Sequence, residues 1–167
     1  MNCFETRNIS TGDVPAPREA IWEILRSPEA LAELTPLLDD ITVDGDLWCW
    51  KMSGISALGV EVAPSFTERM VFDPMESIRF THEPPPDVNQ LAGANGLYTL
   101  ERLDDHTTRL CIDITLHVHL PLPKLSRRAV ERVMWSTMGR TGDVFGKRLY
   151  ARLGIDPALA TQHMVKA

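Results

Sequence analysis

The sequence predicts an α+β domain in which a curved antiparallel sheet packs against one long C-terminal helix. Three observations support this class. Residues 110–120 place an apolar side chain at every even position, which is typical of a half-buried strand. Residues 126–153 form a helical pattern that ends at Gly154, a common helix stop. Short turns join consecutive predicted strands between residues 41 and 120, which favours antiparallel pairing with helices on one side.

The N-terminal third predicts one strand and two short helices. Residues 4–14 read as a strand with weak alternation. Pro17 suits the first turn of a short helix at 18–26. Ser27 is a natural N-cap for a second short helix at 29–34. Both helices therefore follow the first strand directly.

The central part of the chain alternates with period two and predicts about six further strands, which gives about seven in total. Asp44-Gly45 is a tight-hairpin signal within this part. Pro64 predicts an edge, a bulge or two shorter pieces in the run that contains it. The segment 83–96, with three prolines and two glycines, predicts the longest irregular connection. The predicted strands are residues 41–43, 48–52, 60–72, 78–82, 97–103 and 108–120.

The length of 167 residues suits one domain, which we place at residues 1–153, followed by a frayed tail at 154–167. No apolar run approaches the roughly 18 residues that span a membrane. The N-terminus lacks the layout of a signal peptide, so we expect a cytoplasmic protein, either a monomer or a homodimer.

Charge and motifs exclude several classes of function. The net charge of −6 argues against nucleic-acid binding. The three cysteines are scattered, and no metal-ligand, phosphate-binding or dinucleotide-binding motif is present. We therefore expect neither a metal nor a cofactor. Residues 124–152 carry eight Lys/Arg and two Asp/Glu, so the helix is basic on an acidic body. This is either a solvated face or a docking surface for an acidic partner or lipid.

Short phrases occur in the same order as these elements: PAPREAIW at 15–22 followed by SPE at 27–29, FTER at 66–69, and TTRL at 107–110. With the element order they resemble the START-like superfamily, also called SRPBCC, which has a helix-grip fold. The resemblance covers about residues 4–153 and implies a cavity between the sheet and the long helix. That superfamily includes polyketide cyclases, lipid-transfer domains and quinone-binding proteins. It has no shared catalytic motif, so the fold does not imply a reaction.

Candidate ligand contacts follow from the faces that should meet across the cavity. The apolar parity of the strands selects Trp48, Trp50, Phe66, Met70 and Phe80. At 100° per residue, Met134, Met138 and Gly142 share one helix face, with Trp135 at its margin. A glycine inside a helix costs about 1 kcal/mol relative to alanine. The glycines of this helix therefore indicate either close packing or space for a ligand.

Two polar residues share the inward parity, Glu68 and His82. If the hairpin pairs Phe72 with Ile78, then Glu68 faces His82 directly, with Cβ atoms about 4.5–5.5 Å apart. Glu beside His can form a proton-transfer pair near neutral pH. The alternatives are a buried, mutually satisfied pair or a strand end at which both reach water.

The leading hypothesis is a protein that binds a small hydrophobic molecule, such as a lipid, polyketide or quinone-like compound. The alternative is a cyclase- or dehydrase-type enzyme with Glu68 and His82 as its acid/base pair. A second alternative is a protein-interaction module that uses the basic helix. Ligand binding predicts an open cavity, whereas the interaction module predicts a filled core and an exposed patch on the helix.

Overall fold

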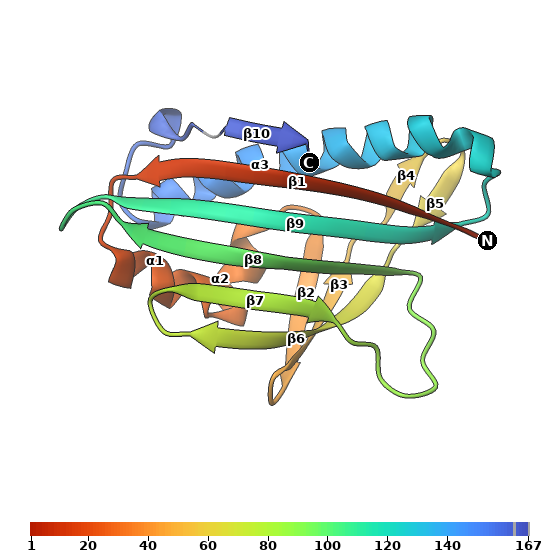
Figure 1. The fold of residues 1–167 in the computed structure, drawn as a ribbon, viewed down its shortest axis with the longest axis horizontal. Helices are drawn as coiled ribbons and strands as arrows, with labels where there is room; N and C mark the ends of the chain where they lie inside the picture. The colour runs from red at the N-terminus through yellow and green to blue at the C-terminus, as the bar shows by residue number, and fades with distance from the viewer. Residues whose placement is uncertain (162, 167) are drawn as a thin grey trace.

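The computed structural model describes residues 1–161 and 163–166. Two 3-10 turns, η1 (Lys124–Ser126) and η2 (Pro157–Leu159), flank the ends of the last helix. The remaining elements, drawn in Figure 1, are β1 (Asn2–Val14), α1 (Arg18–Leu25), α2 (Pro28–Leu34), β2 (Leu38–Asp44), β3 (Leu47–Met52), β4 (Ile55–Ala57), β5 (Val60–Val62), β6 (Ser65–Asp73), β7 (Ser77–His82), β8 (Ala92–Arg102), β9 (Thr108–Leu120), α3 (Arg127–Arg152) and β10 (His163–Lys166).

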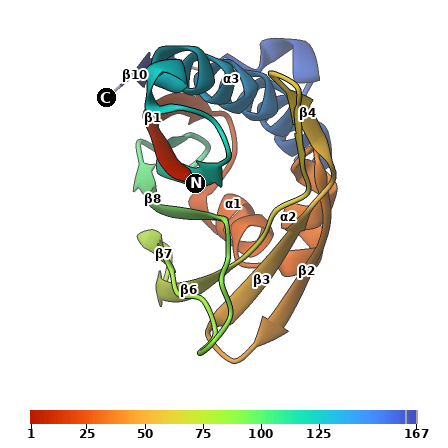
Figure 2. The same cartoon turned by 90° about the vertical axis from the view of Figure 1, so that its right-hand side faces the viewer.

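The main sheet confirms the predicted class. Its strands lie in the order β10-β1-β9-β8-β7-β6-β3-β2, and every neighbouring pair is antiparallel. Seen end-on, the sheet curves from β1 through β8 and β6 to β3 and β2, and α3 lies across its open side (Figure 2). The helices α1 and α2 close one end of the space that the sheet and α3 enclose (Figure 2).

The strand register explains why one face of the sheet is apolar. From β1 through β9, β8, β7 and β6 to β3, even-numbered residues lie opposite even-numbered residues, as for Trp50 with Phe66 and Ile78 with Tyr98. Because successive side chains of a strand point to opposite faces, these even positions face α3. Most of them belong to one buried core cluster. The predicted parity is therefore confirmed for β3 and β6 to β9, whereas β2 pairs its odd-numbered residues with the even-numbered residues of β3, as for Ile41 with Trp50.

Strand β8 begins at Ala92, five residues earlier than the sequence indicated. The extra residues, Ala92 to Gly96, are small and have weak strand propensity, so the pattern predicted an irregular segment. In the structure aromatic rings cover them. A Cβ at Gly96 would overlap the Phe80 ring, and a Cβ at Gly93 would overlap the rings of His82 and His117. The small residues are thus required by the rings packed over the strand.

The C-terminal segment was predicted to be a frayed tail, and this is wrong for the part described. Residues 163–166 form β10, which pairs with β1 and becomes the eighth strand of the sheet. The Sδ atom of Met164 accepts a hydrogen bond from Asn8 Nδ2 at 3.5 Å, and its methyl group packs on Gly139 of α3. The free edge of β1 supplies backbone partners that no sequence pattern reveals. Residues 162 and 167 of the predicted tail lie outside the described residues.

The run at 60–72 is interrupted at Pro64, in agreement with one of the predicted alternatives. Its first piece, β5, pairs with β4 in a separate two-stranded sheet. The turn between them has positive φ at both Leu58 and Gly59. The second piece, β6, lies in the main sheet between β3 and β7.

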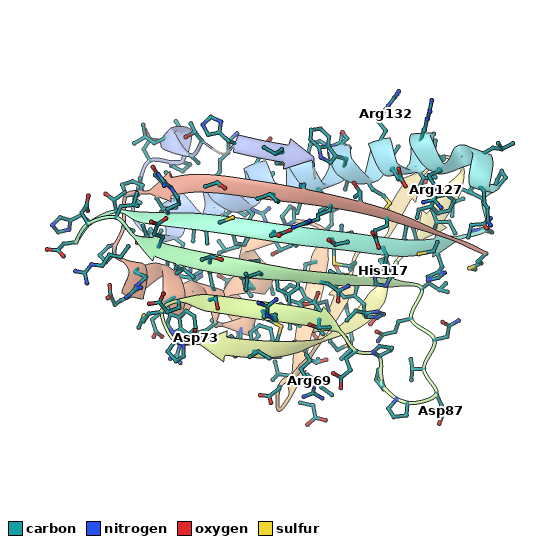
Figure 3. The ribbon with its side chains drawn as sticks, viewed as in Figure 1. Arg69, Asp73, Asp87, His117, Arg127 and Arg132 are labelled. Carbon is teal, nitrogen blue, oxygen red and sulfur yellow. The ribbon has the colours of Figure 1, made fainter. Side chains whose placement is uncertain are left out.

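The basic helix α3 is bound to the body by some of its arginines. Arg127 lies over the Phe4 ring and donates to the backbone oxygen of Cys3 at 3.4 Å, and Arg152 pairs with Glu33 at 2.6 Å. Arg132 projects away from the body of the protein (Figure 3).

Among the described residues, no helix has the length and apolar character that crossing a membrane requires.

Candidate functional site

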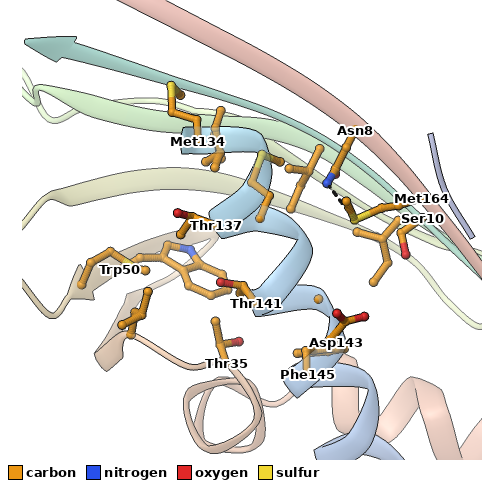
Figure 4. Close-up of a pocket in the computed structure, with 18 of the residues that line it drawn as sticks. Asn8, Ser10, Thr35, Trp50, Met134, Thr137, Thr141, Asp143, Phe145 and Met164 are labelled. Carbon is orange, nitrogen blue, oxygen red and sulfur yellow. Dashed lines mark hydrogen bonds between the residues drawn. The ribbon is translucent and has the colours of Figure 1, made fainter. Parts of the chain in front are cut away.

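A cavity of about 380 Å³ lies between the concave face of the sheet and α3. Strands β1, β3, β6, β7, β8 and β9, the β4–β5 hairpin and one face of α3 supply its walls, and most of the lining side chains are apolar. Figure 4 shows part of the wall, with Thr137, Thr141 and Phe145 on α3 and Trp50 on the facing wall. The volume falls in the range of roughly 300–1,000 Å³ that is typical of small-molecule pockets.

Several residues predicted to contact a ligand line this cavity. They come from β3, β6, β7 and α3, which are far apart in the sequence, and the sheet curvature brings them together. The predicted residues that line the cavity are Trp50, Phe66, Glu68, Phe80, Met134, Met138 and Gly142. Their contact with a ligand stays a prediction.

Three other predicted contacts do not line the cavity. Trp48 and Met70 are buried in the core, where the Trp48 ring packs against Phe72 at 5.8 Å. They have the inward parity, but neighbouring side chains cover them. Trp135 lies beyond the lining face of α3, and its buried Nε1 has no hydrogen-bond partner among the described residues. Parity and helical angle define a face, but they do not show how far along it the open space extends.

Glu68 is the acidic residue of the buried wall. It lies in the middle of β6, opposite Trp48 on one side and His82 on the other, and only 3% of it is exposed. Burial raises the pKa of its carboxyl well above the ordinary value. The Trp50 indole N–H approaches the carboxyl and opposes this rise, although Trp50 Nε1 forms no full hydrogen bond with any described residue. The neutral, protonated carboxylic acid is therefore favoured.

Tyr98 adds a hydroxyl to the same wall. Its ring lies 5.1 Å from the Phe80 ring, and burial raises the pKa of its hydroxyl, with a smaller contribution from the charge of Glu68. Tyr98 therefore remains a neutral donor and acceptor. Tyr98 was not among the predicted contacts, although its even position in β8, two before Leu100, could have identified it.

The predicted register of the β6–β7 hairpin is confirmed, because Glu68 is the Cα partner of His82. The imidazole nevertheless turns to other groups. His82 Nε2 donates to Gln90 Oε1 at 3.1 Å, and the His82 backbone N–H donates to Asn95 Oδ1 at 2.9 Å. Gln90 is itself fixed by Thr67, whose backbone N–H donates to Oε1 and whose hydroxyl accepts from Nε2.

The His82 ring also lies 4.9 Å from the His117 ring and over Gly93. In the described part of the chain, no hydrogen bond joins His82 to Glu68, and His82 does not line the cavity. The expected hydrogen bond between the two side chains is thus not formed among the described residues, although the strands place the two residues opposite each other. The reason is that β7 separates from β8 at its end, where Gln90, Asn95 and Gly93 offer the imidazole both partners and space.

The histidines do not form a metal centre. His117, labelled in Figure 3, lies between His82 and His119 on neighbouring positions of the sheet. Burial and the two neighbouring histidines lower its pKa. Among the described residues, no three His, Cys, Asp or Glu side chains are placed to hold a metal ion.

Additional polar lining residues were not predicted. Thr137 and Thr141 project from α3 on the side of Trp50, and Asn8 lies on the β1 wall (Figure 4). The two threonines are three residues after Met134 and Met138, so the helical spacing could have indicated them. Asn8 carried no such signal, because its strand alternates weakly.

A curved antiparallel sheet, a long helix across its open side and a cavity between them define the helix-grip fold of START-like, polyketide cyclase-like proteins, and the chain has this fold. No protein-family model matches the sequence, and no curated protein is significantly similar to it.

Solved structures of low sequence identity share the fold. A conserved protein from Geobacillus kaustophilus is 15% identical with a TM-score of 0.69, over 94% of this chain and 99% of that one. A START superfamily protein from Mycobacterium smegmatis is 16% identical with a TM-score of 0.63, over 87% and 98% of the two chains. The Zhui aromatase/cyclase from a Streptomyces species is 16% identical with a TM-score of 0.59, over 89% and 95%.

Proposed function

We propose that the protein binds a small, largely apolar molecule in the cavity between the sheet and α3. The observation that carries this proposal is the cavity itself, about 380 Å³ in volume and walled mainly by apolar side chains. Transfer of apolar surface from water into such a space is favourable by roughly 25 cal/mol per Å². A preformed apolar pocket with a few polar groups is the usual form of a small-molecule site.

Gly146 of α3 supports a role in ligand binding over close packing. Gly146 lines the cavity, and a Cβ built there would meet nothing within 4 Å. Glycine inside a helix costs about 1 kcal/mol relative to alanine, so a position with room for a side chain has no packing reason to be glycine. Gly139 differs, because a Cβ there would lie 2.9 Å from Met164 Cε. Open volume at Gly146 is what a ligand requires.

The alternatives have less support. The proposed enzyme needs Glu68 and His82 as one acid/base pair, whereas the His82 imidazole is bound by Gln90. The interaction module needs a filled core, whereas the core encloses a cavity. The solved structures with this fold include a protein described as an aromatase/cyclase and one described as a START superfamily protein, and both kinds are compatible with a ligand in the cavity.

Native mass spectrometry of the protein purified from its own host tests the proposal. We expect a fraction of the protein to carry one added small mass that is lost on denaturation. As a second arm, the purified protein should bind an apolar fluorescent probe, and Gly146→Leu should displace it. A bare native mass together with no saturable probe binding would contradict the proposal.

A further inference from the structure

Three neighbouring strands, β3, β6 and β8 with β7 between the last two, carry buried side chains with polar groups on the cavity wall: Trp50, Glu68 and Tyr98. Trp50 and Glu68 are diagonal neighbours, because the register pairs Trp48 with Glu68 and Trp50 with Phe66. Tyr98 lies within electrostatic reach of Glu68. Each of the three is at least nine-tenths buried.

The hydrogen-bonding capacity of this group is largely unused. Trp50 is only 8% exposed, and its Nε1–H has no full partner among the described residues. Among the described residues, the polar neighbour that lowers the pKa of the Glu68 carboxyl is this indole N–H. An unmade hydrogen bond of a buried group carries a desolvation cost, so native proteins rarely leave such groups without a partner. A ligand oxygen could supply that partner.

We propose that the cavity selects an uncharged, largely apolar ligand whose carbonyl oxygen accepts hydrogen bonds from Trp50 Nε1–H and from the protonated Glu68 carboxyl. The inference rests on the proposed function and adds the polar feature of the ligand. A carbonyl oxygen has two lone pairs, which matches two convergent donors. Tyr98 offers a further donor on the same wall.

Charged ligands and pure hydrocarbons fit Glu68, Trp50 and Tyr98 less well than a carbonyl compound does. A carboxylate would bury a negative charge without a buried cation beside it, because the lining Lys147 is exposed on α3. An ammonium would pair with an ionised Glu68, but it has only donors and would leave Trp50 N–H without a partner. An alkane satisfies neither group. A carbonyl oxygen carries no charge and satisfies both groups.

The charge state of Glu68 makes binding depend on pH. Burial raises the pKa of Glu68, so the protonated donor persists above the usual range of a carboxylic acid and is lost as the pH rises further. Other titratable groups surround it: His82 opposite it in the register, and Tyr98, His117, Asp143, Lys147 and Tyr150 along the cavity. None of them contributes to the pKa shift of Glu68, which comes from burial and Trp50.

Four probes of matched length test the ligand class: 2-undecanone, undecane, decanoate and decylamine. At slightly acidic pH, the wild type should bind 2-undecanone at least about tenfold more tightly than undecane, because the two proposed hydrogen bonds together contribute at least that factor. Decanoate and decylamine should bind more weakly than the ketone. Tighter binding of the acid or the amine, or equal binding of ketone and alkane, would overturn the proposal.

Variants of Glu68 assign the preference to this carboxyl. Glu68→Leu should reduce the ketone preference, because only the Trp50 N–H remains as a donor, whereas Glu68→Gln keeps a neutral donor and should retain the full preference at every pH. The preference of the wild type should decrease as the pH rises. Glu101→Gln, at an exposed position on β8, is the matched control and should behave like the wild type. A ketone preference that Glu68→Leu leaves undiminished would overturn the assignment.

A second measurement needs no variant. With 2-undecanone labelled with ¹³C at the carbonyl carbon, the NMR signal should move downfield on binding relative to its position in an alkane solvent. An unshifted signal from bound ketone would refute the hydrogen bond and leave the proposed function intact. If none of the four probes binds, the proposed function fails as well, so the two failures are distinguishable.

Discussion

The indole of Trp50 and the carboxyl of Glu68 are diagonal neighbours on the cavity wall, and the indole N–H approaches the carboxyl without completing a hydrogen bond. Burial raises the pKa of Glu68, and this single donor is too little to reverse the effect. The wall of the cavity therefore holds a carboxyl group that stays protonated to higher pH than an exposed one, at a buried position where a structural core would hold an apolar residue.

The pH dependence of the free energy of unfolding should reveal the raised pKa of Glu68. The unfolded protein ionises Glu68 near the ordinary value of 4.5, whereas the folded protein keeps it protonated to higher pH. In that window the folded state binds more protons, so the contribution of Glu68 to stability falls as the pH rises. Glu68→Gln removes the titration. The stability of this variant relative to the wild type should therefore increase from pH 4 to pH 8, as measured by urea denaturation.

The matched control for this comparison is Glu101→Gln, which changes an exposed carboxylate on β8. Its stability difference from the wild type should stay within about 0.5 kcal/mol across the same pH range. A difference between Glu68→Gln and the wild type that is independent of pH would show that Glu68 is ionised in the folded protein.

Filling the cavity should separate ligand binding from stability. Gly146→Leu places a side chain in open space on α3, so it should lower 2-undecanone affinity by at least about tenfold. The loss of a helix glycine should at the same time stabilise the protein by about 0.5–1 kcal/mol. Gly146→Ala is the control that gains the same helix propensity with only a methyl group, and its affinity should change by less than about threefold. Reduced stability with unchanged affinity in Gly146→Leu would indicate that Gly146 serves packing.

Gly96 should behave in the opposite way. A Cβ at this position would overlap both the backbone oxygen of Asp113 and the Phe80 ring. Gly96→Ala should therefore destabilise the protein by about 2 kcal/mol or more, since the overlap includes backbone that cannot move freely. Urea denaturation of Gly96→Ala and of Gly146→Ala compares the free energies of unfolding of the two variants. Equal stability of the two alanine variants would contradict the described packing of Phe80 over β8.

His82 should have a structural role in the β7–β8 loop. His82→Gln removes the imidazole that donates to Gln90, and it should cost about 0.5–1.5 kcal/mol of stability. Affinity for 2-undecanone should change by less than about threefold, because His82 does not line the cavity. A calorimetric titration of both proteins measures this. A loss of affinity as large as that of Glu68→Leu would restore the hypothesis that the two residues act together.

The sequence predicted the fold because its strongest signals are periodic. The even-numbered apolar residues of β9 and the pairing of Phe72 with Ile78 depend on local alternation and a short turn, and both are confirmed. Strand β10 and the first residues of β8 were missed for one physical reason. Strand β10 forms because it pairs with the edge of β1, and the first residues of β8 are small because rings pack over Gly93 and Gly96. The side chains of both segments give only a weak strand signal, so the sequence pattern does not indicate strands there.

The candidate site was predicted in part. Parity placed Glu68, Trp50 and Phe80 on the inner face correctly, because the direction of a side chain follows from its position in the strand. The partners of His82 could not be predicted, since Gln90 and Asn95 reach it from an irregular loop and from the next strand. Likewise, the boundary between open cavity and filled core, which separates Trp50 from Trp48, depends on the packing of the whole sheet.

A crystal structure of the wild-type protein grown with saturating 2-undecanone tests the central claim most directly. The account predicts one ketone molecule inside the cavity, with its oxygen about 3 Å from both Trp50 Nε1 and a carboxyl oxygen of Glu68. A cavity that is filled by its own side chains, or a ketone bound only on the outer surface, would contradict it.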